Sequence, residues 1–325
     1  MDKKICVYIG EELKRYGFGN GHPFGAERMV AFWNEMVRQG LDKDVCILRP
    51  VQAEEEDIEQ FHTHEYVEFV KKQSEVGVGY LDYGDTPAFK GVYEAASYVV
   101  GTSLNALKKI MDGDCLRAFI PVAGLHHARR NSAAGFCVFN DCGVVIEVLE
   151  KRYNLERIAY VDIDAHHGDG VYYSFEDDHR LFIADIHEDG NYLYPGTGSA
   201  EERGIGSAKG TKLNIPLLPF SGDETFFNIW PQVEEFLKHA KPEFIIFQCG
   251  ADGISGDPIT HLSYSEAVHA HAAESLCRIA DEFCSGRILA MGGGGYNLKN
   301  LSKAWCAVLR AFLIDPKITE DTPGW

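Results

Sequence analysis

Short apolar runs that alternate with amphipathic stretches place the strongest limit on how this chain can fold. Six runs have the composition of β-strands, at residues 4–9, 117–123, 157–164, 180–186, 243–250 and 287–293. Helical periodicity occupies residues 27–39, 92–110, 140–152, 226–239, 263–282 and 297–312. Strands that are apolar throughout suit a sheet covered on both faces, and repeated strand–helix pairs are typical of parallel sheets. The sequence therefore predicts an α/β fold with a mainly parallel central sheet wrapped by helices.

The pattern continues along the chain without an internal repeat, a low-complexity tract or a proline-rich linker. We therefore expect a single domain over residues 1–325. Residues 51–86 are less regular, and the acidic run EEED at 54–57 is expected to be a solvated face rather than a site.

Charge and composition exclude several classes of function. With 31 basic and 49 acidic residues the net charge is −18, and no cluster of Lys and Arg is present that could bind nucleic acid. No apolar run reaches the roughly 18 to 20 residues that a membrane helix needs, and the opening MDKKICVYIG resembles a strand rather than a signal peptide. Nine cysteines without a C-x-x-C pair indicate a reducing, cytoplasmic setting.

Candidate reactive side chains follow four of the predicted strands. The four segments are GLHH at 124–127, AHHGD at 165–169, GAD at 250–252 and GGGGY at 292–296. In open parallel sheets, ligands bind outside the carboxyl ends of the strands. We therefore expect these segments to meet at one edge of the sheet.

Asp162, Asp164 and His166 alternate at period two, so their side chains share one side of an extended segment. Asp164 and His166 suit a divalent metal, and Asp252 from another strand end is the obvious third ligand, which leaves a position open for water. The alternative is that these residues only cap the following helices. Zinc is the expected ion, but two carboxylates and one imidazole also admit ferrous iron.

Proton transfer is the expected role of the adjacent His126 and His127. Hydrolysis of an amide needs a base for the nucleophile and an acid for the departing amine. Asp162 and Asp169 are available to fix the two imidazoles, which would make two carboxylate–histidine dyads. Either histidine could instead be a hydrogen-bonded core residue.

Tyr296 follows a run of glycines at 292–295, where the backbone can pass close to a ligand. The spacing does not match the dinucleotide fingerprint G-x-G-x-x-G. A phenol above the metal could hydrogen-bond a developing oxyanion. Taken alone, a tyrosine in this position could equally be a packing residue.

Seven segments together resemble the zinc-dependent histone deacetylase family, and especially its bacterial class I-like, acetoin-utilisation-type members. They are HPFGAER (22–28), GLHHA (124–128), GFCVFN (135–140), VDIDAHHGDG (161–170), YPGTG (194–198), GADGISGDP (250–258) and GGGGYN (292–297). The resemblance implies the three-layer α/β/α arginase–deacetylase fold and hydrolysis of an acylated lysine side chain.

The resemblance also implies roles for individual residues. Asp164, His166 and Asp252 match the zinc ligands, His127 the general base and acid, His126 its electrostatic partner, and Tyr296 the oxyanion donor. For the substrate, it implies aromatic channel walls at Phe136 and Tyr194, a backbone acceptor at Gly135, an arginine near the acetate pocket at Arg28, and further contacts at Leu125, Ile259 and Gly294. Structural potassium sites are implied around 162–166 with 185–186, and near Phe175 and Leu181; Asp185 stands where a serine is common.

Two positions bear on the substrate. Tyr194 stands where the family more often has Phe, which adds a hydroxyl to the channel wall. Ile259 is apolar where the family has Met, Leu or Glu, and Glu there accompanies acetylpolyamine substrates. The expected partner is therefore an acylated protein or peptide lysine, with the oligomeric state open.

Three other functions compete with this prediction. An acetylpolyamine amidohydrolase would gain from the −18 charge, which attracts cationic small acylated amines. An arginase-like ureohydrolase would need a further Asp two residues after Asp252, where Ile254 stands. A protein that binds acyl-lysine without turnover would not need the proton-transfer groups.

Overall fold

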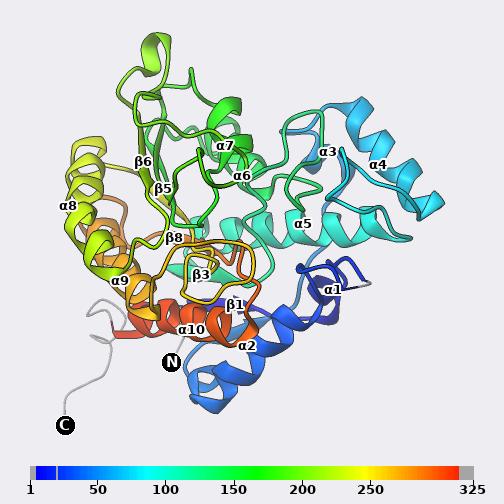
Figure 1. The fold of residues 1–325 in the computed structure, drawn as a ribbon, viewed down its shortest axis with the longest axis horizontal. Coiled ribbons are helices and arrows are strands. Elements are labelled where there is room, and N and C mark those ends of the chain that lie inside the picture. The colour runs from blue at the N-terminus through cyan, green and yellow to red at the C-terminus, as the bar shows by residue number, and fades with distance from the viewer. Residues whose placement is uncertain (1–4, 20, 315–325) are drawn as a thin grey trace.

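The computed structural model describes residues 5–19 and 21–314, and its centre is one eight-stranded sheet in which all neighbouring strands are parallel (Figure 1). The strand order is β2-β1-β3-β8-β7-β4-β5-β6. The strands are β1 (Ile5–Tyr8), β2 (Cys46–Leu48), β3 (Arg117–Ile120), β4 (Ile158–Asp162), β5 (Leu181–Glu188), β6 (Lys212–Leu217), β7 (Phe244–Gln248) and β8 (Ile288–Met291).

Helices cover both faces of the sheet (Figure 1). They are α1 (Glu11–Lys14), α2 (Glu27–Arg38), α3 (Glu55–Ile58), α4 (His64–Val76), α5 (Val92–Met111), α6 (Asp141–Lys151), α7 (Asp169–Ser174), α8 (Asp223–Ala240), α9 (Glu266–Phe283) and α10 (Leu298–Ile314), with 3-10 turns η1 (Leu41–Lys43) and η2 (Gly206–Ala208).

Successive strand residues alternate between two buried cores. Tyr8 and Tyr160 belong to the core that α4, α5 and α6 share, whereas Val7 and Val161 belong to the core of α2, α8, α9 and α10. Because a strand turns alternate side chains to opposite faces, a sheet buried on both sides needs apolar residues at every position. This arrangement confirms the predicted α/β/α layers.

All six predicted strands and all six predicted helices are present, with boundaries shifted by a few residues. Lys4, the first residue of one predicted strand, lies outside the described residues. The edge strands β2 and β6 were not predicted, because β2 is short and only partly buried and β6 contains Lys212 and Pro216. Residues 51–86, expected to be irregular, contain α3 and the longer α4.

The strands β3, β8, β7 and β4 are consecutive neighbours at the centre of the sheet. Their carboxyl ends precede the four segments that carry the candidate reactive residues. The expectation that these segments share one edge is therefore met. No helix within residues 5–19 and 21–314 is both long and apolar enough to cross a membrane.

Candidate metal centre and active site

Asp164 and His166 follow β4, and Asp252 follows β7, so two neighbouring strands deliver one group of donors. His166 Nδ1 lies 3.1 Å from Asp164 Oδ1 and 2.9 Å from Asp252 Oδ2. The three ligand atoms lie within 4.8 Å of one another, and all three residues are buried. The structure thus brings together the predicted metal ligands.

Electrostatics indicate that this group is built around a cation. Burial lowers the pKa of His166, but its hydrogen bonds to Asp164 and Asp252 outweigh burial and raise that pKa to about 10. Burial, followed by repulsion from Asp164, raises the pKa of Asp252 to about 7. Two buried carboxylates with one imidazole leave excess negative charge, which a divalent ion would balance. The residues present therefore fit a metal.

Each carboxylate has one oxygen turned to His166 and the other held by N–H groups. Asp164 Oδ2 accepts hydrogen bonds from Gln248 Nε2 at 2.9 Å and from the Gly294 amide at 2.7 Å. Asp252 Oδ1 accepts from the Ala165 amide at 2.7 Å. A side chain at position 294 would bring its Cβ to 2.3 Å from Asp252 Oδ2, so the close approach of Gly294 depends on its lack of one.

The two predicted dyads are formed. His126 Nδ1 lies 2.8 Å from Asp162 Oδ2, and His127 Nδ1 lies 2.7 Å from Asp169 Oδ1. The Nε2 atoms of the two rings are 3.1 Å apart. Nδ1 of each ring is thus turned to a carboxylate, and the two Nε2 atoms face each other.

Burial, reinforced by the neighbouring His126, lowers the pKa of His127 to about 4. His127 is therefore neutral near pH 7 and has one ring nitrogen that can accept a proton. Burial raises the pKa of Asp169, but the hydrogen bond from His127 outweighs it and holds that pKa below its usual value.

Aromatic rings surround these groups. The Tyr194 ring packs edge-on at 5.2 Å from the His127 ring and 6.4 Å from the His166 ring. The Phe136 ring lies 5.8 Å from the Tyr296 ring. Burial raises the pKa of Tyr296 well above its usual value, so its hydroxyl stays protonated and can donate a hydrogen bond.

Gly135 and Phe136 have the positive φ angles 54° and 67°. A Cβ on Gly135 would lie 2.4 Å from Cδ2 of His127, so the glycine makes room for that ring. The Tyr16 hydroxyl donates to the Phe136 carbonyl at 2.8 Å and accepts from the Val138 amide at 2.9 Å. Cys137 beside them is buried, which raises the pKa of its thiol and makes it a poor nucleophile.

The remaining predicted residues lie at different distances from this centre. Arg28 is buried beside the Tyr296 ring and donates to the carbonyls of Gly293 and Gly295. Its Nη1 atom has no hydrogen-bond partner among the residues that the structure describes. The Leu125 side chain packs into the core of α4, α5 and α6, and its amide donates to Asp141. Ile259 is half-buried on the loop that follows Asp252.

Asp185, which the resemblance associates with potassium, is paired with His187 at 2.7 Å and accepts a hydrogen bond from the Gly168 amide at 2.9 Å. Phe175 and Leu181 are buried core residues. The two potassium sites stay predictions.

Several residues that support the site were missed by sequence reasoning. Asp141 accepts from the amides of Gly124 and Leu125, just before the histidine pair. Gln248 and Tyr16 make the contacts described above, and Thr86 accepts from the Phe136 amide at 3.1 Å. They act through hydrogen bonds to groups that are far away in the sequence, for which no short motif exists. Only their family context could have signalled them.

A second group of possible metal donors lies away from this centre. Glu55, Glu59 and His64 form a second possible donor group, but they are half-buried to exposed, and the Lys71 ammonium already contacts Glu55. This is consistent with the expected solvated face.

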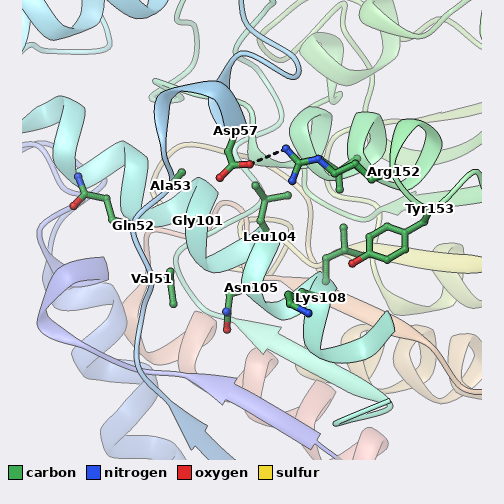
Figure 2. Close-up of a pocket in the computed structure, with 12 residues that line it drawn as sticks. Val51, Gln52, Ala53, Asp57, Gly101, Leu104, Asn105, Lys108, Arg152 and Tyr153 are labelled. Atoms are coloured by element: carbon green, nitrogen blue, oxygen red, sulfur yellow. Dashed lines mark hydrogen bonds and ion pairs between the residues drawn. The ribbon is translucent and has the colours of Figure 1, made fainter. Parts of the chain in front are cut away.

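A cavity of about 420 Å³ lies between α5, α6 and the segment around 51–57, and Figure 2 shows Asp57 bonded to Arg152 at its wall. None of the predicted site residues lines it.

Comparison with known proteins assigns the chain to a family. The sequence model of the histone deacetylase domain matches residues 22–312. The chain belongs to the histone deacetylase family. The acetoin utilization protein AcuC of Bacillus subtilis (strain 168) is 37% identical over 335 aligned positions, which cover 100% of this chain and 86% of AcuC. The histone deacetylase clr6 of Schizosaccharomyces pombe is 31% identical, over 93% of this chain and 75% of clr6.

The crystal structure of the HDA15 HD domain has the same fold, with a TM-score of 0.88 at 24% identity over 96% of this chain and 89% of that one. These findings confirm the resemblance inferred from the motifs. The protein is a hydrolytic deacetylase of a family that generally depends on zinc.

Gly135→Ala should lower the deacetylation rate by about 10²-fold, because a new Cβ would displace His127 from its position. Gly113→Ala is the matched control: its φ is 81°, but no atom lies within 4 Å of the added Cβ. Both variants should lose about 1–2 kcal/mol of stability from the left-handed backbone. Equal deacetylation rates for the two variants would contradict the expected displacement of His127.

Proposed function

We propose that this deacetylase hydrolyses the acyl amide of acylated lysine side chains in proteins or peptides. The observation that carries the proposal is the convergence of a buried donor group, an imidazole pair and a glycine-borne tyrosine from four adjacent strand ends. Metal, proton acceptor and hydrogen-bond donor are the three elements that amide hydrolysis by activated water needs.

In this proposal Asp164, His166 and Asp252 hold the ion. A divalent cation there would lower the pKa of water from 15.7 to about 7 and polarise the acyl carbonyl. Nε2 of neutral His127 accepts the proton of the attacking water and later delivers it to the amine nitrogen. The protonated hydroxyl of Tyr296 donates to the oxygen on which negative charge develops.

The remaining chemistry of the proposal follows the family. The ion is zinc, with ferrous iron as the alternative that the oxygen-rich donor group admits. Potassium ions would support the loops around Asp162 and Phe175. The cytoplasm is the proposed location, since all nine cysteines lie within the described residues and none forms a disulfide.

Features around Tyr194 favour a peptide substrate. A cavity of about 380 Å³ beside Tyr194 is lined by Asp82, Asp85 and Arg129, among others. This cavity has room for residues that flank an acyl-lysine and offers charges of both signs to them. Ile259 provides no carboxylate for a polyamine.

An acetylpolyamine amidohydrolase is the second candidate. It is supported by the −18 net charge and by the two carboxylates near Tyr194, which would attract a polycation. An arginase-like two-metal site is disfavoured, because Ile254 is a buried core residue where a further carboxylate would be needed.

Tyr296→Phe should lower kcat on an acetyl-lysine peptide by about 10² to 10³-fold, because the oxyanion loses its donor. His127→Ala should lower kcat by about 10² to 10⁴-fold through the loss of the proton acceptor. Tyr93→Phe, on α5, controls for the loss of a hydroxyl and should keep the wild-type rate. Wild-type kcat in both site variants would refute the mechanism.

Removal of metal by chelation should abolish activity, and zinc or ferrous iron, loaded separately, should restore it. Asp252→Asn should bind less than stoichiometric metal, measured by elemental mass spectrometry, because a carboxylate ligand becomes a neutral amide. Asp223→Asn changes a carboxylate that accepts from Ser265 elsewhere and should keep full metal content. Full metal content in Asp252→Asn would remove this residue from the ligand set.

Ile259→Glu should raise the ratio of kcat/KM for acetylspermidine to that for an acetyl-lysine peptide about fivefold, as expected for ~1 kcal/mol from a half-exposed ion pair. Ile259→Gln has the same shape without the charge and should leave the ratio nearly unchanged. A wild-type enzyme that already prefers acetylspermidine would favour the second candidate.

A further inference from the structure

We propose that Asp257 is a positioning residue that fixes Tyr296 relative to the loop that carries Asp252 and Ile259. The inference rests on the proposed role of Tyr296 as oxyanion donor. It adds a residue that, within the described part of the chain, has no hydrogen bond to the three proposed metal ligands and acts on the reaction through the tyrosine.

One carboxylate oxygen of Asp257 binds the segment that carries Tyr296, and the other binds an amide of its own loop. Oδ2 accepts a hydrogen bond from the Tyr296 amide at 2.8 Å, and Oδ1 accepts from the Ile259 amide at 3.1 Å. Asp257 is 8% exposed, so little water competes for these bonds. Hydrogen bonds to a charged acceptor are about twice as strong as neutral ones, and one side chain therefore ties the two segments together firmly.

Tyr296 needs a hydrogen bond that fixes its backbone, because the glycines before it allow many backbone conformations. It follows four glycines, of which Gly293 and Gly295 have φ angles of 64° and 119°. Within the described residues no group hydrogen-bonds the Tyr296 hydroxyl, so the ring is held through its backbone and by packing against Phe24 and Phe136. A shift of the amide would move the hydroxyl, which lies at the far end of the side chain.

Other bonds make the Asp257 loop a rigid reference. The Thr260 hydroxyl donates to the Asp252 carbonyl, which links the far end of the loop to the metal ligand. Asn297 and Asn300 donate to the carbonyls of Gly256 and Ser255 at 3.2 and 3.0 Å. These bonds fix the distance between Asp252 and Tyr296. Asp257 is the carboxylate that joins the loop of Asp252 to the segment of Tyr296.

The test is a double-mutant cycle between Asp257→Asn and Tyr296→Phe. Asparagine has the same shape, but it presents an amide NH₂ where one acceptor oxygen faced an N–H. We expect kcat to fall about 10- to 100-fold in Asp257→Asn, as for a displacement of about 1 Å, with a smaller change in KM. In a Tyr296→Phe background the same substitution should lower kcat no further. Asp223→Asn, which also removes an acceptor of backbone N–H, should leave kcat unchanged.

Metal content and thermal unfolding are measured on every variant. Three results would overturn the proposal: wild-type kcat in Asp257→Asn, a loss of equal size in both backgrounds, or loss of bound zinc that accounts for the fall in kcat. Wild-type kcat in Tyr296→Phe would instead refute the proposed function, and with it this inference. If Asp257→Asn does not fold, Asp257→Glu keeps the charge but shifts the oxygens by one methylene, and its loss of kcat must likewise vanish with Tyr296→Phe.

Discussion

Excess negative charge at Asp164 and Asp252 is the constraint on which the rest of the site depends. Both carboxylates are buried beside one imidazole, and buried charge is costly unless it is paired. The surrounding backbone meets this cost with N–H donors from Ala165 and Gly294 on the oxygens that do not face His166. Asp164 Oδ1 and Asp252 Oδ2 both face His166 Nδ1, and these three donor atoms together fit a metal.

This charge can be concentrated because four central strands end at one edge. β4 and β7 bring the donors, β3 the imidazole pair, and β8 the glycines and Tyr296. Gln248, at the end of β7, bonds both Asp164 and the carbonyl of Gly124, so it joins the metal centre to the segment that precedes the histidines. The groups proposed for proton transfer and for metal binding are thus parts of one hydrogen-bonded unit.

The sequence predicted those parts of the fold and site that short patterns encode. Continuous apolar runs identified the buried strands, and period-two spacing placed Asp162, Asp164 and His166 on one side of the chain. Edge strands lacked that signal, because partly solvated strands tolerate residues such as Pro216. The hydrogen bond from Tyr16 to the Phe136 carbonyl joins residues 120 positions apart. No pattern in the sequence around Tyr16 indicates that partner.

Phe136 illustrates how the site uses strain. A bulky residue at φ 67° is disfavoured by about 1–2 kcal/mol, and it follows Gly135, which also has a positive φ. Tyr16 and Thr86 bond the backbone on both sides and hold this conformation. As a consequence, the backbone of Gly135 lies against the His127 ring, and the Phe136 ring lies against the Tyr296 ring. Relaxation of this turn would alter both contacts together, so its rigidity sustains the shape of the site.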